Sequence, residues 1–148
     1  MKFSKKSRYG VAALIDLAVN SKNGHVALGS IAERNEISPQ YLEQVFASLR
    51  RAGIVKSVKG SQGGYLLKYP SSSITVASII QALEGTYYLD DEETKTEERA
   101  AGIAETIQED IVDRVNHGLD QILQNLTLAD LEESFQERQS GGQEMYYI

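Results

Sequence analysis

The 148-residue sequence predicts a mainly α-helical protein with one small β-hairpin and one long helix in its C-terminal half. Two observations lead to this fold class. Apolar residues recur at the three- and four-residue spacing of amphipathic helices along most of the chain. Two short runs, around residues 54–58 and 65–67, are rich in β-branched and aromatic residues and flank a glycine-rich turn, which is typical of a hairpin.

The first third of the chain predicts three helices. Apolar spacing indicates a helix over about 7–20, a short helix that Ser30 can cap, and a longer helix over 39–52. Ser38 is a suitable N-cap for the third helix, and Pro39 fits its first position, where no N–H needs a partner. The glycine after residue 52 ends this helix.

The rest of the chain is dominated by a second amphipathic pattern. After the hairpin, Thr75 caps a helix that ends before Gly85, and an acidic, irregular stretch follows over 87–98. A long stripe then predicts a helix of about 27 residues, which would span roughly 40 Å. A last short helix starts at Thr127, and a flexible polar tail follows from residue 138. The stripe consists of Ile103, Ile107, Ile111, Val115, Leu119, Ile122 and Leu126.

Charge is unevenly distributed between the two halves. Residues 1–70 contain 11 Lys/Arg and 4 Asp/Glu, whereas residues 71–148 contain 4 Lys/Arg and 17 Asp/Glu. This asymmetry indicates a polyanion-binding front half and a different role for the rear half. Chance clustering of solvated charges is the alternative.

The composition excludes several classes of site. The chain has no cysteine, which excludes disulfides, thiol nucleophiles and cysteine-ligated zinc or iron–sulfur sites. No catalytic set of nucleophile and base is apparent, so we expect no enzymatic activity. The acidic stretch is either a solvated loop or a Ca²⁺ or Mg²⁺ site, and we expect no metal. No membrane helix or signal peptide is present, so we expect a cytoplasmic protein.

The order helix, short helix, turn, helix, hairpin describes a winged helix-turn-helix, whose second paired helix lies in the DNA major groove. Gln40, Glu43, Gln44 and Lys59 are therefore candidates for base or groove contact. Candidate phosphate contacts lie at helix ends and beside the hairpin. They are Lys5, Lys6, Arg8, Ser38, Tyr41, Arg50, Arg51 and Lys56.

The long stripe offers more apolar surface than one chain can cover. A homodimer, with the long helix crossing its twin, resolves this and places two reading helices on a palindrome. Packing within a monomer is the alternative. We expect four parts: a DNA-binding domain over 1–85, an acidic linker over 86–99, dimerisation helices over 100–137 and a flexible tail over 138–148.

Four motifs stand in the expected order along the first part of the chain. They are Lys6-x-Arg8-Tyr9-Gly10, Ile37-Ser38-x-x-Tyr41-Leu42-Glu43-Gln44, Leu49-Arg50-x-Ala52-Gly53-Ile54-Val55 and Val58-Lys59-Gly60-x-x-Gly63-Gly64-Tyr65-Leu66-Leu67. Over roughly residues 1–85 they resemble the IscR/NsrR/CymR family of bacterial dimeric repressors. The resemblance implies a homodimeric repressor of double-stranded DNA. Many members bind an iron–sulfur cluster through three cysteines in the linker, and this chain has none there, so we expect no cofactor.

The missing cysteines make the chain most similar to the cluster-free cysteine-metabolism (CymR) branch of that family. Those repressors pair with O-acetylserine sulfhydrylase, the cysteine synthase, which captures partners ending in isoleucine. The resemblance thus implies a partner-binding tail formed by Met145, Tyr146, Tyr147 and Ile148. A tail that packs on the dimer is the alternative. The other open functions are a protein-interaction module without DNA binding and a regulator of another pathway that binds a small molecule directly.

Overall fold

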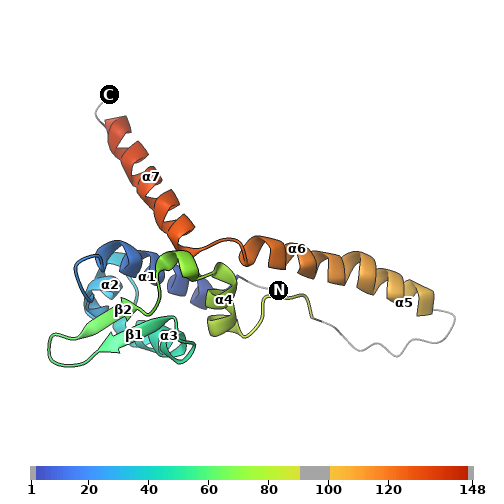
Figure 1. Ribbon diagram of the computed structural model, residues 1–148, viewed down its shortest axis with the longest axis horizontal. Coiled ribbons are helices and arrows are strands. Elements are labelled where there is room, and N and C mark those ends of the chain that lie inside the picture. Colours follow the sequence, from blue (N-terminus) through green and yellow to red (C-terminus); the bar gives the residue numbers. More distant parts are fainter. Residues whose placement is uncertain (1–2, 91–100, 147–148) are drawn as a thin grey trace.

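The computed structural model of the protein describes residues 3–90 and 101–146 (Figure 1). The N-terminal part contains four α-helices, a short 3₁₀ turn and a two-stranded hairpin. In chain order these are α1 (Lys5–Asn20), α2 (Leu28–Asn35), α3 (Pro39–Arg51), β1 (Val55–Val58), β2 (Gly64–Leu67), η1 (Ser71–Ser73) and α4 (Val76–Glu84).

The described C-terminal part is helical except for a short non-helical link over residues 124–127. Its elements are α5 (Ala101–Ile107), the π-helical segment η3 (Gln108–Asp113), α6 (Arg114–Leu123) and α7 (Leu128–Tyr146). In Figure 1, the helical arm formed by α5, η3 and α6 and the far end of α7 project from the N-terminal part in different directions. The predicted fold class is confirmed.

Capping explains where most helices begin. The Ser4 side chain accepts from the Ser7 N–H at the start of α1, and Ser38 accepts from the Tyr41 N–H at the start of α3. Thr75 caps α4 in the same way. Helix α2 differs from the prediction: it begins two residues before Ser30, and its N-cap, Ala27, makes no side-chain hydrogen bond.

The core of the N-terminal part lies between α1, α2, α3 and α4. Phe46, Leu14, Leu17 and Ile79 are fully buried there, and Leu128 from the start of α7 joins the same core. Because Leu128 is buried in this core, the first turns of α7 are part of the N-terminal fold.

The hairpin is antiparallel, with Val55 opposite Leu67 and Val58 opposite Gly64. Its turn is tight. A Cβ on Gly63 would lie 2.2 Å from the carbonyl oxygen of Val58, which is too close for any side chain. The glycine-rich turn is therefore a steric requirement of this hairpin.

The long helix is continuous but not uniformly α-helical. The sequence predicts one helix over about 100–126, and the structure has helical backbone from Ala101 to Leu123 with η3 in its middle. Steps of four between the stripe residues overshoot the 3.6-residue α-helical turn. A wider π-helical turn offsets part of that drift.

The expectation of a flexible tail from residue 138 is wrong for the described residues. Helix α7 continues through Gly141 and Gly142 to Tyr146. Extending an existing helix costs much less than nucleating one, so two glycines, at about 1 kcal/mol each relative to alanine, do not end it. Thr127 and Asp130 cap its start reciprocally, as predicted for a helix beginning here.

Candidate nucleic-acid interface

Helix α3 buries one face and presents the other to solvent. Leu42, Val45, Phe46 and Leu49 are buried in the core. The predicted readers on the opposite side, Gln40, Glu43 and Gln44, are all exposed. The amphipathic pattern thus places three hydrogen-bonding side chains on the outer face of this helix.

The first turn of α3 is organised by Ser38. Its hydroxyl oxygen accepts from the Tyr41 N–H at 3.2 Å and lies 3.3 Å from Oε1 of Gln40, to which the hydroxyl donates. Gln40 is therefore held beside the helix start with its amide NH₂ group directed elsewhere. The half-buried Tyr41 ring packs edge-on against Tyr9 of α1, with 5.7 Å between ring centroids.

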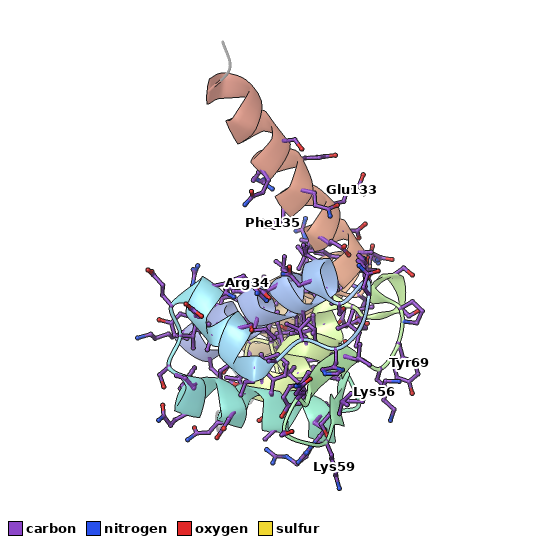
Figure 2. The ribbon with its side chains drawn as sticks, turned by 90° about the vertical axis from the view of Figure 1, so that its left-hand side faces the viewer. Arg34, Lys56, Lys59, Tyr69, Glu133 and Phe135 are labelled. Atoms are coloured by element: carbon purple, nitrogen blue, oxygen red, sulfur yellow. The ribbon has the colours of Figure 1, made fainter. Side chains whose placement is uncertain are left out.

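The hairpin lies beside the outer face of α3. A surface groove of about 540 Å³ separates them, and its lining includes Glu43 and Arg50 from α3 and Lys59 from the hairpin turn. Figure 2 shows Lys59 at the bottom of the view, with Phe135 and Glu133 of α7 above the N-terminal part, on its other side. The groove thus brings together a carboxylate acceptor and two cations from elements that are distant in sequence.

The segment before α2 holds the hairpin in place. Val26 and Tyr65 pair as an isolated antiparallel bridge, and the exposed His25 places Nε2 2.6 Å from the carbonyl oxygen of Gln62 in the turn. A carbonyl oxygen can only accept, so this Nε2 carries the proton. The sequence pattern does not predict the contacts of His25 and Val26 with the hairpin. Only the close-approach glycines of the turn indicate that another backbone lies nearby.

The remaining candidate phosphate contacts lie at the margins of this surface. Arg50, Arg51 and Lys56 are exposed at the end of α3 and on β1. Lys5 lies over the Tyr9 ring and Arg8 over the Phe3 ring, at 5.4 and 5.3 Å from the ring centroids. Lys6 is half-buried.

The predicted dimer stripe divides into two groups. Ile103, Ile107, Ile111, Val115 and Ile122 are exposed, with 65% of Ile103 and 63% of Ile122 accessible to solvent. Leu119 and Leu126 instead pack within the chain against a small second core formed by Val76, Ala77, Ile80 and Tyr87. The arm therefore uses one side to attach to α4 and leaves an apolar stripe uncovered.

Two tyrosines and an aspartate connect the segment after α4 to α6. The Tyr87 hydroxyl donates to Oδ1 of Asp120 at 2.5 Å, and the Tyr88 hydroxyl lies 2.7 Å from both carboxylate oxygens. Burial, and then the bond to Asp120, raises the pKa of Tyr87 to about 12. The hydrogen bonds from Tyr87 and Tyr88 lower the pKa of Asp120, and the same contact raises the pKa of Tyr88. The sequence pattern alone does not indicate this contact.

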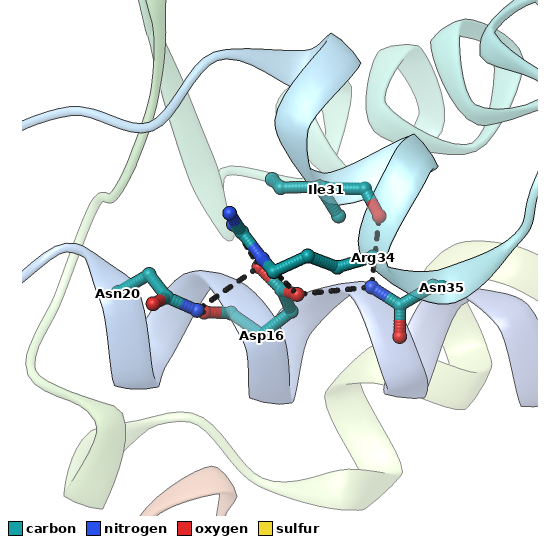
Figure 3. A network of polar contacts seen from close by, with 5 residues as sticks. All are labelled: Asp16, Asn20, Ile31, Arg34 and Asn35. Carbon is teal, nitrogen blue, oxygen red and sulfur yellow. Dashed lines mark hydrogen bonds and ion pairs between the residues drawn. The ribbon is translucent and has the colours of Figure 1, made fainter.

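A second polar network joins α1 to α2 (Figure 3). Arg34 donates to Asp16 through Nε at 2.9 Å and Nη2 at 2.7 Å, and Asn35 donates to the same carboxylate at 3.0 Å. The bond to Asp16 raises the pKa of Arg34 above its ordinary value. These side chains border a groove of about 1040 Å³ between α1 and α7, whose apolar lining includes Ile15 and Phe135.

The described residues offer neither a metal site nor a membrane-spanning helix. Among the described residues, no group of three or more His, Cys, Asp or Glu side chains could hold a metal ion. None of the helices in residues 3–90 and 101–146 is long and apolar enough to span a membrane. The acidic run after Asp90 lies outside the described residues, as do Tyr147, Ile148 and the side chains of Met145 and Tyr146.

A polar helix face beside a basic hairpin, on a helix-turn-helix scaffold, defines the class of a winged-helix DNA-binding transcriptional regulator. Comparison with known proteins agrees. The family model for Rrf2, described as an iron-dependent transcriptional regulator, matches residues 3–134. The chain therefore belongs to the Rrf2 family, whose members include transcriptional regulators rather than enzymes.

Individual relatives are similar over nearly the whole chain. A helix-turn-helix-type transcriptional regulator of Haemophilus influenzae is 39% identical over 133 residues, which cover 88% of this chain and 86% of the relative. The solved structure of CymR (YrzC), described as the global cysteine regulator of B. subtilis, has a TM-score of 0.76 at 36% identity and covers 90% of this chain and 98% of that one. The T. potens IscR structure has a TM-score of 0.71 at 40% identity, and the match covers 94% of this chain and 91% of that one.

The Rrf2 family model is described as iron-dependent, which raises the question of whether this chain has ligands for iron. A cysteine-ligated cluster does not fit, because the chain contains no cysteine. The resemblance to the IscR/NsrR/CymR family is confirmed, and the class of the regulator follows from it.

Proposed function

We propose that the chain is a homodimeric repressor that binds a pseudo-palindromic operator. One observation carries this proposal: the outer face of α3 and the hairpin turn border one groove, with Glu43, Arg50 and Lys59 in its lining. A reading helix and a wing presented together fit a major groove and the phosphates beside it. Binding there would block transcription of the adjoining gene.

Within this proposal, each candidate side chain has a role that its chemistry permits. Gln40 and Gln44 pair best with adenine, and Glu43 accepts from the cytosine amino group. Lys59, in the turn of the wing, enters a groove of the DNA. The proposed phosphate contacts are Lys5, Lys6, Arg8, Ser38, Tyr41, Arg50, Arg51 and Lys56.

The exposed apolar stripe of the arm supports the proposal of a homodimer. Five apolar residues, from Ile103 to Ile122, lie in the open in one chain, although covering a single isoleucine side chain contributes about 1.5–3 kcal/mol. A second arm offers the same surface, so a twofold pairing covers both stripes. In the proposed division, residues 1–85 bind DNA and residues 100–137 form the dimer. Helix α7 leads from these residues into the tail.

We further propose control of cysteine or sulfur-assimilation genes without a cysteine-ligated cluster. Similarity to the structure described as a global cysteine regulator supports this, as does the absence of cysteine from the chain. O-acetylserine sulfhydrylase is the proposed partner, bound through Met145 to Ile148. Helix α7, which is described as far as Tyr146, extends away from α3 and the hairpin (Figure 1).

Selection of bound fragments from the host genome, with and without that organism's cysteine synthase, tests the proposal. We expect a palindrome upstream of sulfur genes, enriched more strongly when the enzyme is present. Deleting residues 145–148 should leave binding by the dimer alone intact and abolish the complex with the enzyme. A palindrome elsewhere, indifferent to the enzyme, would reject the cysteine role and retain the repressor.

A second candidate function is regulation by a directly bound small molecule. The groove between α1 and α7 supports it, because this groove of about 1040 Å³ combines apolar residues with the Asp16–Arg34 pair. A metabolite that weakens operator binding by wild type but not by Phe135→Ala would favour this candidate. A protein-interaction module without DNA binding predicts no salt-dependent DNA signal, whereas phosphate contacts make binding fall linearly on log–log axes with salt.

A further inference from the structure

Hydrogen bonds join the arm to the N-terminal part at two separate places, beside the apolar packing of Leu119 and Leu126 on the second core. At the C-terminal end of α6, the Val76 N–H donates to the carbonyl oxygen of Leu126, and the Leu128 N–H donates to that of Ile74, both at 2.8 Å. These two bonds fix the end of the arm to the start of α4.

The second attachment is a polar latch, which we define as Tyr87, Tyr88, Asn116 and Asp120. The two tyrosine hydroxyls converge on the Asp120 carboxylate, and Asn116 accepts from the Leu89 N–H at 2.8 Å. Asn116 and Asp120 are four residues apart, so they lie on the same side of α6. The latch therefore holds the arm one to three helical turns before the C-terminal end that the two backbone bonds fix.

Two separated attachments determine the direction of a rigid rod. From Asp120 to Ile103 the arm extends for about 25 Å at 1.5 Å per residue. A rotation of about 10° at the latch would move the far end by about 4 Å, which is close to the 3.4 Å rise of one base pair. A small change at the latch is thus large enough to matter for the spacing of two DNA-binding units.

We infer that the latch sets the distance between the two recognition helices of the dimer, and with it the half-site spacing that the protein accepts. The inference rests on the proposed homodimer and deepens it. Asp120 is a positioning residue here: it touches no DNA and acts through the angle of the arm. The polar chemistry supports this role, since Asp120 is only partly buried and contributes its carboxylate, not apolar area, to the junction.

The test uses the full chain with Asp120→Asn, which keeps the size of the side chain but removes its charge, and the milder Tyr88→Phe. Asp110→Asn is the matched control, because it makes the same charge change at an exposed position of the same arm. Affinities are measured for duplexes whose selected half-sites are moved together or apart by one or two base pairs. A single half-site and the dimer dissociation constant are measured in parallel.

We expect wild type and Asp110→Asn to prefer one spacing at least tenfold over its neighbours. Asp120→Asn should reduce that preference to threefold or less, or move it by a base pair, with single half-site affinity within twofold of wild type. A latch variant that dimerises and keeps the wild-type spacing profile would overturn the inference. A wild-type chain that does not dimerise or bind DNA would instead refute the proposed function.

A second readout does not depend on DNA. Because the chain has no cysteine, Gln81→Cys on the exposed side of α4 gives one spin label per chain. Pulsed electron paramagnetic resonance then measures the distance between the two labels of a dimer. We expect Asp120→Asn to shift or broaden this distance by several ångströms, and an unchanged distribution would count against the latch.

Discussion

Val26 and Tyr65 exchange two backbone hydrogen bonds, from Val26 N to Tyr65 O at 3.0 Å and from Tyr65 N to Val26 O at 2.9 Å. This pair makes the segment before α2 a third edge of the wing. The wing is thus fixed to the scaffold that carries α3, and a loose two-stranded hairpin would not hold this position by itself.

Gly64 should be intolerant of a side chain for this reason. A Cβ there would lie 2.3 Å from the carbonyl oxygen of Val26, which is backbone and cannot rotate away. We expect Gly64→Ala to lower the free energy of unfolding by about 1–3 kcal/mol and to weaken DNA binding. Gly29→Ala is the control, because nothing lies within 4 Å of its Cβ position. Urea unfolding that shows equal stability for both variants would contradict the close approach.

Glu43 should read a base, and Lys56 should not. We expect Glu43→Ala to relax preference at one base pair per half-site by about 1–3 kcal/mol. Lys56→Ala should weaken binding to all sequences alike and lower the salt slope by about 1. Titration of operator and scrambled duplexes at several salt concentrations measures both. Equal losses on the two duplexes for Glu43→Ala would show that it reads no base.

Ile107 should hold the dimer together. It is 50% exposed in one chain, so Ile107→Glu should not disturb the fold of that chain. Placing two carboxylates in the interface should raise the dimer dissociation constant by ~100-fold or more, since two isoleucines lose their burial. Sedimentation equilibrium measures this. Thr106→Glu lies one residue away and off the stripe, so it should raise the dimer dissociation constant far less. An equal rise for both variants would show that the stripe is not the dimer interface.

Tyr87 should make the fold sensitive to alkali. Its pKa is raised to about 12 from an ordinary value of 10, so the unfolded chain loses this proton first as pH rises. The stability that Tyr87 contributes is therefore complete below about pH 10 and is lost between about 10 and 12. Urea unfolding of wild type and Tyr87→Phe across this range should show the smaller pH dependence for the variant. If the free energy of unfolding depended on pH equally in both proteins, the Tyr87 hydroxyl would not be buried and bonded to Asp120 as described.

The sequence predicts the local features well because they depend on near neighbours. Ser38, Thr75 and Thr127 cap the helices expected of them, and Gly63 occupies the tight turn that its spacing indicates. The flexible tail is the main error. Ser140 and the following glycines have poor helix propensity, but the established helix before them propagates through the segment.

Long-range partners could not be predicted. Nothing near Val26 indicates that it pairs with Tyr65, and the residues between Tyr88 and Asp120 give no sign of the latch. The stripe is an intermediate case: its helical spacing is readable, but only the fold shows that Leu119 and Leu126 pack on α4 and the isoleucines do not.

Selection of bound sequences from a random duplex library by the purified protein tests directly whether a dimer reads DNA with α3 and the wing. A dimer that reads DNA with α3 and the wing predicts an inverted repeat, with half-site centres about 10–10.5 base pairs or a multiple of that apart. Its binding should weaken steeply with added salt. Recovery of no sequence, or of a single half-site without its inverted partner, would contradict the account.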